Sequence, residues 1–456
     1  MPASRILTAR VVIGLTVVLG CLCVHASDPW PEPRPIALDT PAFRAPEEPP
    51  EDAAAQESLA PEPEAPLALQ DALALALMRN PDLATFSWDV RAGEARALQA
   101  GKAPNPELDI RLQQLGIPRA SAEPDDLRTR VILSQDFELG RKRHRRVVLA
   151  EMETELAGWD YEAKRIEVAT LVAGHFVAVL GAQRRVESSR RFVEFLEEMR
   201  DTVSKLVETG TMRNLELHQV ARQVGLARID LQRAENELSA ARFRLAATWG
   251  SQSPRFTEAV GDLGQLTPVP DIDVVLDLAQ RSPAIARWEA ELARGQAALA
   301  LAKAGRVPDL RVGAGVRWQE NQDDQDYLLD LEISLPFFDR KQGEIREAQY
   351  DMARAQAARK SAAAAGDDGI AELYFQVTES MARAVTLRDE VVPAAQATYD
   401  SLHRGFEVEP GNLDDFLDAR RDLARAESDH TVALVDFHQS LAALEGIVGQ
   451  SLGEAE

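Results

Sequence analysis

Aspartate, glutamate and histidine are the side chains of this sequence that could do chemistry, and their spacing argues against catalysis. Asp415 and Asp418 lie three residues apart, so a helix would place both carboxylates on one face. Asp414 and Asp415 also follow Asn412 as acids commonly do at a helix start. The histidines show no metal-ligand spacing, and the chain has neither a glycine-rich phosphate loop nor a nucleophile elbow. We expect no enzyme activity, no cofactor and no metal-ligand set.

Composition indicates long helices and a preference for cations. In the 456 residues, aromatic side chains make up 5%, and the apolar share consists largely of Ala and Leu, which is typical of packed helices. The formal net charge of −23 disfavours nucleic acid or an anionic membrane surface as the partner and favours cations. Solubility alone is the alternative explanation of this acidity.

The N-terminal residues have the pattern of an export signal. Two arginines precede an apolar stretch at 11–24, which is short for a bilayer-spanning helix, and Ala26 offers a cleavage point. We therefore predict that residues 1–26 are a signal peptide. The alternative is lipidation of Cys21.

The next segment differs sharply in composition. Residues 27–66 consist mainly of Pro, Ala and Glu, which predicts a disordered, extended tether. No later segment has the roughly 18 consecutive apolar residues of a transmembrane helix. Any membrane crossing must therefore be made by strands.

Two candidate hairpins, at 107–137 and 309–335, carry alternating apolar side chains. The alternation is strict at 310–318 and 327–335, and each stretch has the length of one tilted transmembrane strand. In the first hairpin the alternation of apolar and polar residues is less regular. A half-buried hairpin of a soluble domain is the alternative, but four strands without another sheet must pair with other chains or lie in lipid.

The helices predicted around these hairpins are unusually long. Residues 141–209 contain no proline and predict one helix of about 100 Å, which turns back at Gly210. Residues 340–403 and 413–444 repeat this arrangement in the second half. Apolar residues recur at three- and four-residue steps, which indicates coiled-coil packing.

The two halves of the chain repeat one unit. The Pro81 and Pro106 segments return around Pro283 and Pro308, at the same spacing in both cases. We predict a first structural repeat at 67–250 with a turn near 210, a linker at 251–270, and a second repeat at 271–450 with a turn near 410. The fold class is mainly α with a membrane β part.

Local motifs add a family resemblance that covers roughly residues 67–450. Phe406-Glu407-Val408-Glu409 precedes Asp415-Phe416-Leu417-Asp418-Ala419, and Gly210 precedes Glu216 in the same frame. With the duplicated helix, hairpin and helical pair, the chain resembles the TolC-like outer-membrane efflux family, particularly its heavy-metal members. At Glu409 it departs from the family, which has a glycine there.

The resemblance implies a homotrimer in which three chains of four strands close a 12-stranded barrel in the outer membrane. The helices would extend into the periplasm of a Gram-negative bacterium as a hollow tunnel. The implied partners are a periplasmic adaptor, an inner-membrane proton-driven pump and outer-membrane lipid, with no nucleic acid.

The resemblance also assigns roles to residues at the two helical turns. A threefold ring of carboxylates in a narrow entrance favours cations and would act as a gate. The gate residues implied by position are Asp415, Asp418 and Glu216. Contacts with the adaptor are expected at Gly210, Phe406, Glu409, Pro410 and Gly411.

These inferences favour a passive exit duct of a tripartite efflux pump that exports heavy-metal cations. A drug or solvent duct of the same architecture is the alternative, because the sequence has no Met cluster and no Cys or His run. A non-conducting periplasmic scaffold or adaptor is disfavoured by the two amphipathic hairpins.

Overall fold

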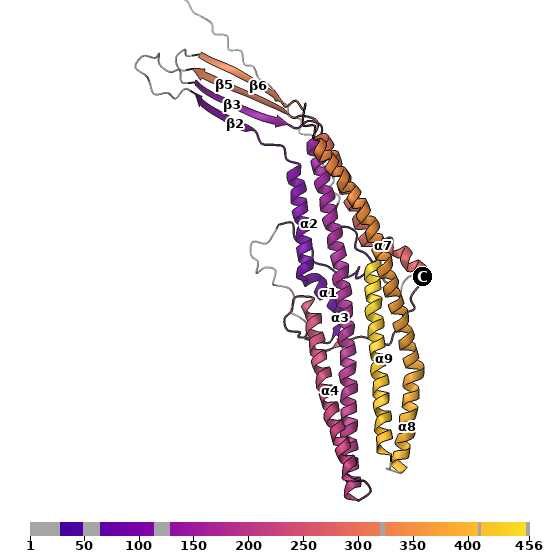
Figure 1. The fold of residues 1–456 in the computed structure, drawn as a ribbon. Helices are drawn as coiled ribbons and strands as arrows, with labels where there is room; N and C mark the ends of the chain where they lie inside the picture. Colours follow the sequence, from indigo (N-terminus) through magenta and orange to yellow (C-terminus); the bar gives the residue numbers. More distant parts are fainter. Residues whose placement is uncertain (1–27, 49–63, 114–127, 320–323, 409–411, 453–456) are drawn as a thin grey trace, which may run out of the picture.

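The chain forms an elongated molecule with a sheet at one end and two long helical hairpins at the other (Figure 1). The computed structural model describes residues 28–48, 64–113, 128–319, 324–408 and 412–452. Cys21 and the predicted signal peptide lie outside the described residues.

The order of elements shows the duplication. The first half contains β1 (Leu67–Ala68), α1 (Leu69–Arg79), α2 (Pro81–Ala100), β2 (Glu107–Gln113), β3 (Arg128–Phe137), α3 (Lys142–Glu208) and α4 (Asn214–Ala247). The second half contains β4 (Ala259–Val260), α5 (Ile272–Ala279), α6 (Pro283–Ala304), β5 (Leu310–Gln319), β6 (Asp324–Ile333), α7 (Gln342–Thr386), α8 (Val392–Val408) and α9 (Leu413–Val448).

The two hairpins combine into one antiparallel sheet. Its strand order is β2-β3-β5-β6, so the β3–β5 pair joins the two halves, with Val131 opposite Val316. Within the described chain, the outer edges of β2 and β6 have no partner strand. The sheet is therefore open at both sides in a single subunit, and open edges favour pairing with another chain.

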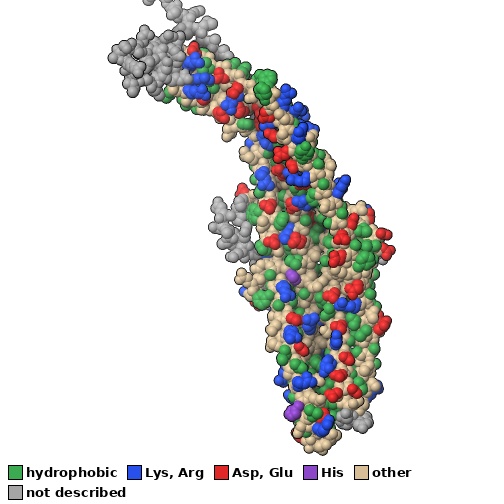
Figure 2. Space-filling model, in the orientation of Figure 1, with side chains coloured by type: hydrophobic (Ala, Val, Ile, Leu, Met, Phe, Trp, Pro, Cys, Tyr) green, Lys and Arg blue, Asp and Glu red, His purple; other side chains and the backbone are tan. Residues whose placement is uncertain are grey.

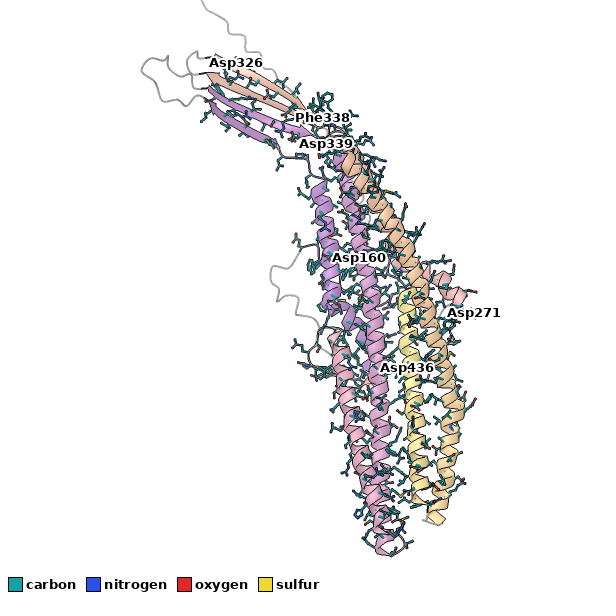
Figure 3. The ribbon with its side chains drawn as sticks, viewed as in Figure 1. Asp160, Asp271, Asp326, Phe338, Asp339 and Asp436 are labelled. Carbon is teal, nitrogen blue, oxygen red and sulfur yellow. The ribbon has the colours of Figure 1, made fainter. Side chains whose placement is uncertain are left out.

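The register separates the sheet into an apolar and a charged face. The apolar face carries Val316, which is half-buried, and the following exposed side chains: Leu108, Ile110, Leu112, Leu133, Tyr327, Leu329, Leu331 and Ile333. On the opposite face Arg311 Nε donates to Asp136 Oδ1 at 2.7 Å, and Arg130 pairs with Asp330. Asp326 marks the end of the sheet far from the helices (Figure 3). One face suits lipid and the other suits water.

Glycines in β5 make room for a well-buried side chain on the charged face, that of Ile132. Ile132 is 4% exposed and lies over Gly313 and Gly315. A Cβ on Gly315 would lie 2.2 Å from the Val131 carbonyl oxygen. Both positions of β5 therefore need a residue without a side chain.

The long helices form two hairpins that lie side by side. α3 packs against α4, and α7 and α8 pack against α9, while contacts of α3 with α6 and α9 join the hairpins. By length and composition, one stretch of α3 qualifies as a membrane span, but 44% of that window is buried within the chain. Buried core helices meet the same length and composition criterion. The burial of α3 therefore indicates that this stretch is apolar because it packs against other helices.

The second long helix runs without a gap from Gln342 to Val408, close to the prediction for 340–403, but its α-helical hydrogen bonding is interrupted once. A π-helical turn at Leu387–Val391 separates α7 from α8. Pro393 lies two residues after this turn. Proline has no N–H to donate and its ring crowds the carbonyl one turn earlier, so a widened turn relieves that clash.

The segment at 28–48, which we call the N-terminal strap, is packed against the helices and differs from the tether expected for 27–66. The Trp30 ring meets the Tyr161 ring edge to face, with centroids 4.7 Å apart. Tyr161 Oη donates to the Phe43 carbonyl oxygen at 2.8 Å. Composition alone does not reveal these contacts, because they depend on a receiving surface on α3.

A buried ion pair on α3 also holds the strap. The side chains of Glu162 and Arg165 are 2% and 3% exposed, and Arg165 Nη2 donates to Glu162 Oε1 at 2.7 Å. Arg165 also donates to the carbonyl oxygens of Arg34 and Ile36. The strap thus supplies the hydrogen bonds that a buried guanidinium requires.

Candidate functional site

The ends of α3 and α8 and the starts of α4 and α9 lie at the end of the molecule far from the sheet (Figure 1). The first turn ends α3 in a Schellman motif. Gly210 has φ +78°, its N–H donates to Val207, and the Thr211 N–H donates to the Leu206 carbonyl at 2.8 Å. The left-handed conformation at Gly210 explains why glycine occurs there.

Glu216 lies in the first turn of α4. Arg213 Nη2 donates to Glu216 Oε1 at 2.6 Å, and this hydrogen bond is the main reason that the pKa of Glu216 is lowered from its ordinary value. Its other oxygen, Oε2, is buried and has no hydrogen-bond partner in the described part of the chain. Glu216 is therefore an ionised carboxylate with acceptor capacity to spare.

The second turn leads into α9, which carries the other two predicted gate residues. Asp415 is exposed, and its Oδ2 accepts from Asn412 Nδ2 at 2.6 Å. Asp418 is exposed as well, and Arg421 Nη1 donates to its Oδ1 at 2.7 Å. Both carboxylates thus face solvent at the start of one helix, each with a single local partner among the described residues.

The predicted adaptor-contact residues of this turn divide into two groups. Phe406 is 7% exposed, and its ring stacks on Phe416 with centroids 5.2 Å apart. Its ring supports the turn from inside and is not presented at the surface. Glu409, Pro410 and Gly411 lie outside the described residues.

An aromatic cluster connects the two hairpins above the turns. Phe195 of α3 meets Phe416 of α9 and Tyr399 of α8 at centroid distances of 5.7 and 6.2 Å. The Arg420 guanidinium lies over Phe195 at 5.3 Å and over Tyr399 at 5.6 Å. Sequence reasoning missed this cluster, although the three-residue spacing of Phe192 and Phe195 marks an aromatic helix face.

The structure does not bring the histidines into a common site within the described residues, and it holds no group of three or more potential metal-ligating side chains there. Burial lowers the pKa of His175, His430 and His438. A ring nitrogen of His438, Nε2, lies 3.0 Å from the Leu263 carbonyl oxygen. These histidines belong to the packing of the helices.

An open-edged sheet with an apolar face, joined to two long helical hairpins with acidic turns, defines a class of membrane-anchored duct subunits. The model of the outer membrane efflux protein family matches residues 72–251 and 274–450. The chain therefore belongs to the outer membrane efflux protein family, and each half of the duplication corresponds to one match.

Two relatives and one solved fold illustrate the similarity. The cobalt-zinc-cadmium resistance protein CzcC of Cupriavidus metallidurans is 29% identical over 385 residues, covering 84% of this chain and 90% of CzcC. The nickel-cobalt-cadmium resistance protein NccC of Alcaligenes xylosoxydans xylosoxydans is 28% identical over 291 residues, covering 63% and 64%. The channel-forming protein CusC matches with a TM-score of 0.72 and 15% identity, covering 90% of this chain and 99% of CusC.

The comparisons confirm the family and the fold class expected from the sequence. The protein is an outer-membrane efflux component, located in the outer membrane and extending from it into the periplasm.

Proposed function

We propose that three copies of this chain form a passive exit duct for heavy-metal cations. The observation that carries the proposal is the combination of family membership with similarity to CzcC, a cobalt-zinc-cadmium resistance protein, over most of both chains. The net charge of −23 agrees with a cationic cargo.

The open sheet supports the homotrimer. A strand edge within the hydrocarbon layer leaves backbone N–H and C=O groups without partners, which is costly in lipid. Pairing β2 of one subunit with β6 of the next would satisfy both free edges and close the sheet into a barrel. Twelve strands from three copies follow from four strands per chain.

We assign the gate to Asp415, Asp418 and Glu216. In a threefold assembly each acid occurs three times at one level, so the exposed carboxylates would form rings of negative charge near the tunnel entrance. Arg213 and Arg421 each pair with one of these acids, and exchange of such pairs for cation contacts would regulate passage.

Two partners complete the proposed system. The sequence holds no phosphate-binding loop, so an inner-membrane proton-driven pump would supply the energy. A periplasmic adaptor would contact the turns at Gly210 and at 409–411. Phe406, whose ring is buried, would shape this contact indirectly.

Complementation in a host that keeps a cobalt-zinc-cadmium pump and adaptor but lacks the outer-membrane component tests the cargo. We expect this chain to restore growth on cobalt, zinc or cadmium and to lower the metal retained in the cells. A host that lacks the pump is the control, and it should stay sensitive. Restored export of dyes or solvents without any gain in metal resistance would establish the alternative cargo.

A further inference from the structure

The junction between sheet and helices exposes large aromatic side chains. Phe337 is 68% exposed and Phe338 is 94% exposed, between the end of β6 and the start of α7. Figure 3 places Phe338 and Asp339 at the bend between the two parts of the molecule. The apolar face of the sheet continues to this bend through Leu335, which is also exposed. The junction therefore extends the lipid-facing surface towards the helices.

A run of basic residues at 141–146 lies at the corresponding junction between β3 and α3. Lys142 Nζ lies 2.8 Å from a carboxylate oxygen of Asp309, and Arg146 pairs with Glu138 at 2.6 Å. The other arginines of the run are exposed and form no ion pair in the described ranges: Arg141, Arg143 and Arg145. Arg340 is exposed and likewise unpaired within them.

Helix stability does not account for this charge. The first turn of α3 contains no acidic residue, although the positive end of a helix dipole favours acids there. Arg141 and Lys341 precede α3 and α7 with φ values of 59° and 56°. This left-handed backbone conformation is unfavourable for residues other than glycine. Both copies of the repeat thus retain a basic residue where the backbone favours glycine.

We propose that this junction collar, formed by Arg141, Arg143, Arg145, Arg340, Phe337 and Phe338, binds the headgroups of anionic phospholipids in the periplasmic leaflet of the outer membrane. Guanidinium groups bind phosphate oxygens in pairs, and aromatic rings prefer the depth of the headgroups. Basic side chains gather beside the bend in Figure 2. The collar is a local exception to the net charge of −23, which disfavours anionic surfaces for the molecule as a whole.

Lipid retention by the full chain tests this proposal. The purified protein is placed in nanodiscs of phosphatidylcholine with a minor fraction of phosphatidylglycerol, and the lipid that survives delipidation is quantified by mass spectrometry. We expect phosphatidylglycerol to be enriched several-fold over its bulk fraction. Replacing Arg141, Arg143 and Arg145 by Gln should lower the enrichment about fivefold or more, because each removes a charge near the headgroups.

A matched variant controls for net charge. Arg222, Arg404 and Arg425 are exposed on helices that lead to the turns, and changing all three to Gln removes the same charge far from the sheet. This variant should retain the wild-type enrichment. Equal enrichment in both triple variants, or equal loss, would overturn the proposal.

A salt titration of the wild-type protein covers the case in which the collar variant does not assemble. Screening weakens contacts between exposed charges, so the enrichment should fall as salt rises from about 0.05 to 1 M. Enrichment that is independent of salt would also overturn the proposal.

Discussion

At the scale of residues, each acid predicted for the gate has a defined local partner. Asp415 and Asp418 are exposed, and Glu216 is ionised beside Arg213. The partners lie three positions away in each case, at the spacing that brings side chains together on a helix. Sequence spacing therefore suffices to place the acids, whereas the aromatic cluster around Arg420 depends on how two hairpins pack.

Gly210→Ala should loosen the first turn. The alanine would meet no atom within 4 Å, so its cost is that of a left-handed backbone, about 1–2 kcal/mol. Hydrogen exchange of peptides covering the turn should quicken by roughly five- to thirtyfold. Gly225→Ala is the matched control in an open helical position of α4, where alanine is favoured and exchange should not quicken. Equal exchange in both variants would contradict the Schellman assignment.

Tyr161 should make the strap sensitive to alkali. Burial raises its pKa to about 12 from an ordinary value of 10.0. The unfolded side chain ionises first as pH rises, so the stability supplied by the neutral phenol is complete below pH 10 and is lost between pH 10 and 12.

Absorbance of tyrosinate measures this shift. Subtracting the titration of Tyr161→Phe from that of the wild type should leave a single step near pH 12. Tyr350→Phe provides a control, because the Tyr350 side chain is 68% exposed. The titration of this variant should still contain the step assigned to Tyr161. A difference step centred at pH 10 would show that Tyr161 is not buried beneath the strap.

At the scale of elements, alternation and length were sufficient to predict strands and hairpins. The expected strands at 310–318 and 327–335 correspond to β5 and β6 within a few residues, and the first hairpin extends from 107 to 137. The π-helical turn before Pro393 and the packed strap were not predicted. The first depends on a local clash, and the second on a distant surface of α3 that composition does not describe.

The close contact of β3 with β5 should make Gly315 intolerant of any side chain. A Cβ there would lie 2.2 Å from a backbone oxygen, which cannot move without breaking the strand pair. We expect Gly315→Ala to cost about 1–3 kcal/mol and to reduce the amount of assembled protein in the outer membrane.

Gly313→Ala is the graded control for that measurement. Its nearest contact would be a methyl group of Ile132 at 3.1 Å, and a side chain yields more readily than the backbone. Assembly should therefore be reduced less than in Gly315→Ala. Equal amounts of wild type and Gly315→Ala in outer-membrane fractions would contradict the strand register.

At the scale of the whole molecule, duplication explains the architecture. Each half contributes one strand hairpin and one helical hairpin, and the halves meet at the β3–β5 pair and along α3 and α9. A single chain leaves two sheet edges open, so the proposed duct exists only in the assembly. In the proposed trimer the acids of the turns would act together as rings, a property that no single subunit has.

Conductance of the purified protein in planar bilayers tests the duct most directly. We expect cation-selective currents that rise when Asp415 and Asp418 are both changed to Ala, because the proposed carboxylate rings would narrow the entrance and hold cations. The absence of current from both the wild type and the double variant, despite confirmed insertion, would contradict the duct.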